Sequence, residues 1–105
     1  MKRIIFAVCF ALSAVMTYAS QHHVVGQKDK MFSVDELTVS VGSTVEFRNE
    51  DPFFHNVYSL SDLKTFDLGS YPKGESRAVT FDQPGDVEIE CAIHPSMIMT
   101  VHVTE

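Results

Sequence analysis

The chain has 105 residues, of which 14 are acidic and 8 are basic, so its formal net charge at pH 7 is −6. This acidic balance, with no basic stripe along the chain, argues against nucleic acid as a partner, because binding to phosphates requires clustered Lys and Arg side chains. The length suits one domain with a small core, and domains of this size are often stabilised by a disulfide or a metal.

Residues 1–19 predict a secretory signal peptide. Met1-Lys2-Arg3 is a short positive start, residues 4–16 are almost wholly apolar, and Thr17-Tyr18-Ala19 places small residues one and three positions before the expected cleavage site. The apolar run is shorter than the roughly 20 residues of a membrane-spanning helix. We therefore expect an exported, periplasmic protein with one domain over residues 20–105 and no stable membrane insertion after cleavage.

His22 and His23 form a separate signal at the start of the expected mature chain. Cleavage after Ala19 or after Ser20 makes a histidine the third residue. A free amine with a histidine in the third position can bind Cu(II) or Ni(II) in a square plane of nitrogens. The interpretation that we favour is a disordered polar terminus.

The remaining chain is expected to form short strands separated by turns. Turn signals recur about every 8–12 residues, the spacing of an all-β sandwich. Alternating apolar and polar residues predict strands at 37–41, 45–48, 55–58, 77–81, 86–91 and 100–104. Residues 59–75 contain Gly69, Pro72 and Gly74 and are expected to be an irregular crossing loop with at most one helical turn. We therefore predict an all-β fold, a short Greek-key β-sandwich whose ends are loops.

Cys91 is the only cysteine that remains after removal of the leader, so an internal disulfide is impossible in the expected mature protein. It ends a strand in which Val87 and Ile89 have the same parity, and its side chain should therefore point into the sandwich. By the same argument His102 should point outward from the last strand. The thiol is then either a small buried hydrophobe or a metal ligand.

Three potential ligands occur within one short segment. Cys91, His94 and Met97 offer a thiolate, an imidazole and a thioether, and His55 offers a second imidazole from an earlier strand. Two histidines and a cysteine with a weak axial methionine are the ligands of a blue-copper electron-transfer centre. Singly, each residue has an ordinary structural explanation in a core or on a surface, whereas their combination favours the ligand interpretation. Met99 remains an alternative axial ligand, because residues 97 and 99 share a face.

These motifs resemble the cupredoxins, the small type 1 blue-copper proteins that include amicyanin, pseudoazurin and plastocyanin. The likeness extends from about Met31 to Val103, and its most specific part is the short Cys-x-x-His-x-x-Met spacing at residues 91–97 after an upstream His-Asn pair. It implies a cupredoxin-like domain with one type 1 copper ion. The copper ligands that it implies are His55, Cys91, His94 and Met97.

The resemblance also implies roles for two neighbours of the ligands. The side-chain amide of Asn56 is expected to hold the ligand loop, residues 91–97, and its backbone N–H is expected to hydrogen-bond the Cys91 sulfur. Ile93 stands where short-loop members often have proline. It therefore leaves an N–H that could hydrogen-bond the Cys91 sulfur and favour Cu(I).

A resemblance to cupredoxins implies an electron carrier and not an enzyme. We expect a monomer that passes single electrons between redox proteins such as a dehydrogenase and a c-type cytochrome. These partners should dock near His94, where Phe53 or Phe54 joins Pro95 in an apolar face, and an acidic surface suits a partner with basic residues.

Three other functions fit these residues less well. A periplasmic copper-delivery or copper-storage protein is the main alternative, since several methionines are available, although delivery requires exposed ligands and Cys91 should point inward. A copper oxidase or nitrite reductase needs a second copper with more histidines than this chain offers. A structural zinc domain is disfavoured because zinc prefers stronger fourth ligands than a thioether.

Overall fold

A computed structural model of the chain describes residues 21–105, and the expected signal peptide, residues 1–19, lies outside them. The described part consists of strands and loops without a helix, so no helix in it could cross a membrane. The strands are β1 His22–Lys28, β2 Met31–Phe32, β3 Glu36–Ser40, β4 Ser43–Asn49, β5 His55–Ser59, β6 Phe66–Tyr71, β7 Ser76–Phe81, β8 Gly85–Glu90 and β9 Ile98–Thr104.

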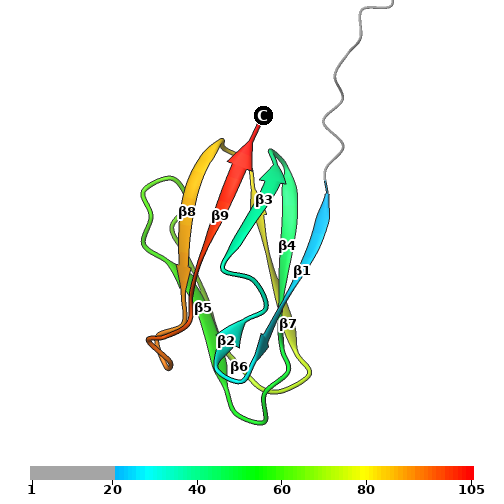
Figure 1. The fold of residues 1–105 in the computed structure, drawn as a ribbon, viewed down its shortest axis with the longest axis vertical. Helices are drawn as coiled ribbons and strands as arrows, with labels where there is room; N and C mark the ends of the chain where they lie inside the picture. Colours follow the sequence, from blue (N-terminus) through cyan, green and yellow to red (C-terminus); the bar gives the residue numbers. More distant parts are fainter. Residues whose placement is uncertain (1–20) are drawn as a thin grey trace, which may run out of the picture.

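Two mixed sheets pack face to face and form a β-sandwich (Figure 1). One sheet has the order β2-β1-β4-β7, and the other has the order β3-β9-β8-β5-β6. Each sheet contains one parallel pair, β1 with β4 and β3 with β9, and the remaining pairs are antiparallel. The all-β sandwich predicted from the sequence is confirmed.

The core lies between the sheets and follows the period-2 pattern of the strands. Val45 and Phe47 on β4, in one sheet, and Val87 and Ile89 on β8, in the other, belong to this core, and all four are fully buried. Burying an aliphatic or aromatic side chain of this size contributes about 1.5–3 kcal/mol. This alternation fixes the register of each strand, because a shift by one residue would turn its apolar side chains to water.

The prediction that His22 and His23 lie in a disordered terminus is wrong. His22 and His23 belong to β1, which pairs in parallel with β4, so that His22 lies opposite Thr44 and His23 opposite Val45. The strand was not evident from the sequence because Gly26 interrupts its alternation and because its hydrogen bonds come from a distant partner. Segment 59–75 was also expected to be irregular, but β6 occupies its second half and pairs with β5.

Loops at one end of the sandwich bring together residues that are distant in the sequence. The antiparallel neighbours β5 and β8 meet where Tyr58 pairs with Glu90, so the start of β5 lies beside the residues that follow β8. The β8–β9 loop and the β4–β5 connection therefore lie at the same end (Figure 1). The short β1–β2 turn, which belongs to the same sheet as β4, contacts the β4–β5 connection through hydrogen bonds to Asp51.

Candidate metal centre

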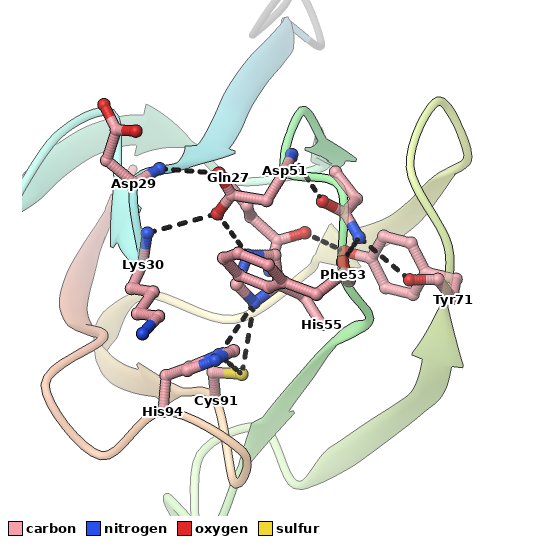
Figure 2. A network of polar contacts seen from close by, with 10 residues as sticks. Gln27, Asp29, Lys30, Asp51, Phe53, His55, Tyr71, Cys91 and His94 are labelled. Carbon is pink, nitrogen blue, oxygen red and sulfur yellow. Dashed lines mark hydrogen bonds and ion pairs between the residues drawn. The ribbon is translucent and has the colours of Figure 1, made fainter.

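Three potential ligand atoms converge at this end of the sandwich. The Sγ atom of Cys91 lies 3.8 Å from Nδ1 of His55 and 3.9 Å from Nδ1 of His94, and the two Nδ1 atoms are 3.1 Å apart (Figure 2). His55 opens β5, Cys91 immediately follows β8, and His94 lies in the β8–β9 loop. Cys91 is fully buried, as its strand parity predicted, His55 is also fully buried, and His94 is half-buried.

Met97 stands level with Cys91. In the β8–β9 pairing Met99 lies opposite Ile89. The next inward-facing pair is Cys91 and Met97, where the Cys91 N–H donates to the Met97 carbonyl at 3.2 Å. Met99 is therefore two strand residues, about 6.6 Å, further into the sandwich. The Met97 N–H also donates to the His94 carbonyl at 2.9 Å, which closes a tight turn between these two residues.

The ring of His55 is anchored on its far side by a carboxylate that the sequence interpretation missed. Nε2 of His55 lies 2.7 Å from Oδ2 of Asp51, which is 3% exposed. Burial opposes ionisation of Asp51, but the hydrogen bonds from His55 and from the backbone N–H groups of Lys30 and Asp29 outweigh it and lower the pKa of the carboxyl group. The only sequence signal was an acid four residues before a histidine, in a segment that a polar turn explains equally well.

Asn49 fixes the turn that carries Asp51. Its side-chain amide donates to the carbonyls of Phe53 and Tyr71, at 2.8 and 3.0 Å, and its Oδ1 accepts from the Asp51 N–H at 2.8 Å. Asn49 is itself fully buried. Both hydrogen-bonding ends of the amide are thus used, and the path of the chain from β4 into β5 is set by this one side chain.

His94 lies beside an aromatic ring that also contacts His55 and carries a lysine amine over its face. The ring of Phe53 lies 5.2 Å from the ring of His94 and 5.3 Å from that of His55, and the Lys30 amine lies 5.7 Å from the Phe53 ring centre. Burial lowers the pKa of His94, the neighbouring His55 and Lys30 lower it further, and the Asp51 carboxylate opposes this fall. The imidazole is consequently neutral at pH 7, the form that binds a metal.

The side chain of Asn56 holds the ligand loop as expected, because its Oδ1 accepts from the Ala92 N–H at 2.7 Å. The expected N–H donors to sulfur are not formed. Within residues 21–105, the polar contacts of the Cys91 sulfur are the two imidazoles, and neither the Ile93 N–H nor the Asn56 N–H donates to it.

The donor set fits copper. Within the described part of the chain, His55, Cys91 and His94 are the only group of three metal-ligating side chains that lie within 4.8 Å of one another. One buried thiolate and two imidazoles suit copper in both of its common oxidation states. His102 is not part of this group, since it points outward and contacts Asp86 and Glu36.

Comparison with known proteins agrees with this chemistry. A family described as copper binding proteins, plastocyanin/azurin family, matches residues 19–104. A solved structure of a methionine-to-alanine variant of amicyanin with Cu(I) is similar, with 26% identity and a TM-score of 0.74, and the match covers 79% of this chain and 82% of that one. A search of curated protein sequences gave no match.

Two other solved structures are similar over nearly the same part of the chain. The Cu-containing nitrite reductase of Thermus scotoductus SA-01 is 30% identical with a TM-score of 0.72, and the match covers 78% of this chain but 22% of that one. A purple cupredoxin from Nitrosopumilus maritimus, 21% identical with a TM-score of 0.70, matches over 78% of this chain and 99% of its own length. The first likeness thus concerns one part of a much longer enzyme, and the second concerns the fold.

Proposed function

The chain belongs to the plastocyanin/azurin family of copper-binding proteins, and from this premise we propose that it carries single electrons through one type 1 copper site formed by His55, Cys91, His94 and Met97. Copper held there supplies a one-electron couple between Cu(I) and Cu(II). The observation that carries the proposal is the convergence of the Cys91 sulfur and the two Nδ1 atoms within 3.9 Å of one another.

The ligand side chains are held in place by the fold. His55 is fixed by β5 and by Asp51, while Cys91 is enclosed between the sheets beside the Met97 backbone. A rigid, largely buried set of donors changes little between oxidation states, which favours rapid electron transfer over ligand exchange. The register of β8 with β9 supports Met97 as the axial ligand, because Met97 is level with Cys91 and Met99 is not.

Electrons would enter and leave at the half-buried edge of His94. The loops around it expose apolar side chains: Phe54 is 56% exposed, Ile93 is 48% exposed, and Pro95 is also on the surface. A small apolar face on a chain of net charge −6 suits brief contacts with a redox protein that has basic residues around its own centre. A dehydrogenase as donor and a c-type cytochrome as acceptor are the partners that we propose.

Copper delivery or storage is less well supported. A delivery protein must offer ligands that another protein can reach, whereas His55, Cys91 and Met97 are each at most 1% exposed. The likeness to a nitrite reductase does not favour an enzyme, because this chain corresponds to 22% of that protein. We also propose that the protein is exported to the periplasm, on the basis of the leader-like residues 1–19, and that it acts there as a monomer.

The proposal is tested by adding Cu(II) to the apoprotein. We expect an intense visible absorption from the thiolate and a reversible midpoint potential in the wild type. Cys91→Ser should abolish the absorption while the apoprotein keeps its far-UV circular dichroism, since the sandwich does not depend on the thiol. His102→Gln is the matched control, because it removes a histidine outside the site, and it should stay blue.

Three results would count against an electron carrier. These are a wild type that stays colourless, a Cys91→Ser variant that stays blue, and a bound copper that a mild chelator removes within seconds. The last result would favour delivery.

A further inference from the structure

Asp51 is the only buried acidic side chain in residues 21–105. A buried carboxylate is unfavourable unless hydrogen bonds compensate for its lost hydration. Three donors do so here: the backbone N–H of Asp29 at 2.8 Å from Oδ1, the backbone N–H of Lys30 at 3.1 Å from Oδ2, and Nε2 of His55 at 2.7 Å from Oδ2. Figure 2 shows the carboxylate between the β1–β2 turn and the imidazole.

The two backbone donors come from a strained turn. Asp29 and Lys30 link β1 to β2 with φ angles of 54° and 57°, and the flanking residues Lys28 and Met31 pair across the hairpin. Two-residue turns of this conformation usually place glycine second, because other residues are disfavoured in the left-handed region. A lysine persists there when surrounding contacts fix the backbone, and both turn N–H groups are directed at Asp51.

We infer that Asp51 is a positioning residue for the copper site. Its carboxylate keeps the proton of His55 on Nε2 and so directs Nδ1 towards Cys91 and His94. It also places a buried negative charge beside His55, and this charge favours the oxidised metal. This inference rests on the proposed function. A carboxylate that accepts the second N–H of a ligating histidine fixes the tautomer and the ring orientation and makes the ligand more basic. The basic and anionic environment stabilises Cu(II) more than Cu(I).

Asp51 is held in this position by a residue on β4 and by the β1–β2 turn. The Asn49 side chain at the end of β4 accepts a hydrogen bond from the Asp51 N–H, which fixes the backbone from which the carboxylate reaches His55. The β1–β2 turn closes the other side. The orientation of a ligand on β5 is thereby connected to a hairpin in the opposite sheet.

The first test is Asp51→Asn, which keeps the size of the side chain and one oxygen acceptor but removes the charge. Loss of an outer contact of this kind commonly changes metal affinity by about 10–100-fold. If Cu(II) affinity falls about tenfold relative to Cu(I), the midpoint potential rises by about 59 mV. We expect that rise together with a retained but shifted visible absorption.

Asp86→Asn is the matched control. It also removes one negative charge from a carboxylate that contacts a histidine, since Asp86 Oδ1 lies 2.6 Å from Nδ1 of His102, but that histidine is outside the copper site. We expect its potential and spectrum to equal those of the wild type. Equal shifts in Asp51→Asn and Asp86→Asn, or none in either, would overturn the inference, because the effect would then not pass through His55.

The second test uses the wild type and therefore does not depend on whether Asp51→Asn folds. Nitrogen NMR of His55 in the metal-free protein should show the tautomer protonated on Nε2, with a proton protected from exchange. A proton on Nδ1 would refute the inference. If Cu(II) gives no blue colour in the wild type, the proposed function fails, whereas the tautomer still decides the role of Asp51.

Discussion

The choice between the two methionines is tested by the same substitution at both positions. Met97 and Met99 are each 1% exposed, so Met97→Gln and Met99→Gln bury the same amide to the same extent. They differ in place, because Met97 stands opposite Cys91 whereas Met99 stands opposite Ile89. Met97→Gln should lower the midpoint potential and change the visible spectrum, since an amide oxygen is a harder ligand than a thioether and favours Cu(II).

Met99→Gln should mainly cost stability. Its amide would lie between the sheets among aliphatic side chains, and a buried polar group without a partner costs about 1–3 kcal/mol. For a domain of this size each kcal/mol corresponds to a fall in Tm of about 4–8 °C. That loss is a large fraction of the 5–15 kcal/mol by which most domains are stable. The spectrum and the potential should remain those of the wild type.

Visible spectroscopy, voltammetry and thermal unfolding of the apoprotein measure these effects together. Met99→Leu serves as a control, because a volume-conserving apolar exchange costs less than about 1.5 kcal/mol and should leave the copper site unchanged. If Met99→Gln shifts the potential and Met97→Gln changes only the stability, the register argument is wrong and Met99 is the axial ligand.

Two further predictions concern residues near the surface. The imidazole of His102 donates hydrogen bonds to Asp86 and Glu36, and these bonds raise the pKa of His102 above 6.5. The stability that the charged imidazole contributes is therefore fully present below pH 6.5 and is lost as the pH rises through the raised value. Urea unfolding should therefore show a larger difference between wild type and His102→Gln at pH 5.5 than at pH 9, and equal differences would contradict the ion pairs. Asn56→Ala removes the bond to the Ala92 N–H, worth about 0.5–1.5 kcal/mol, and should speed the loss of copper to a chelator; an unchanged rate would show that this bond does not hold the ligand loop.

Local sequence pattern predicted the strands whose alternation is complete. Val45 and Phe47 on β4, and Val87 and Ile89 on β8, alternate with polar residues, and both strands were located within a few residues. β1 and β6 were missed because Gly26 and Gly69 interrupt them, and Gly69 has a φ of 73° beside a shift in the β5–β6 register. Their pairing partners, which lie elsewhere in the chain, determine these strands more than their own sequence does.

In the candidate site, too, the residues that share a local motif were predicted from the sequence, whereas the residue that depends on distant contacts was not. Cys91, His94 and Met97 lie in one short loop, so spacing and strand parity were enough to group them before their positions were known. Asp51 has no such signature, because its role depends on the N–H groups of a turn more than twenty residues earlier and on the ring that it supports. An acid before a proline is an ordinary turn signal in sequence.

For the Ile93 N–H the sequence predicted a contact that the structure does not form. The absence of a proline correctly indicates a free donor, but a donor within three residues of a sulfur need not point at it. In the structure the loop is held instead by Asn56, which binds the Ala92 N–H, and by the Met97 N–H bound to the His94 carbonyl. A linear motif therefore identifies which atoms can bind a metal, whereas the contacts that orient those atoms depend on how the loops meet. The substitutions that tune the copper potential should accordingly be sought at Asp51 before Ile93.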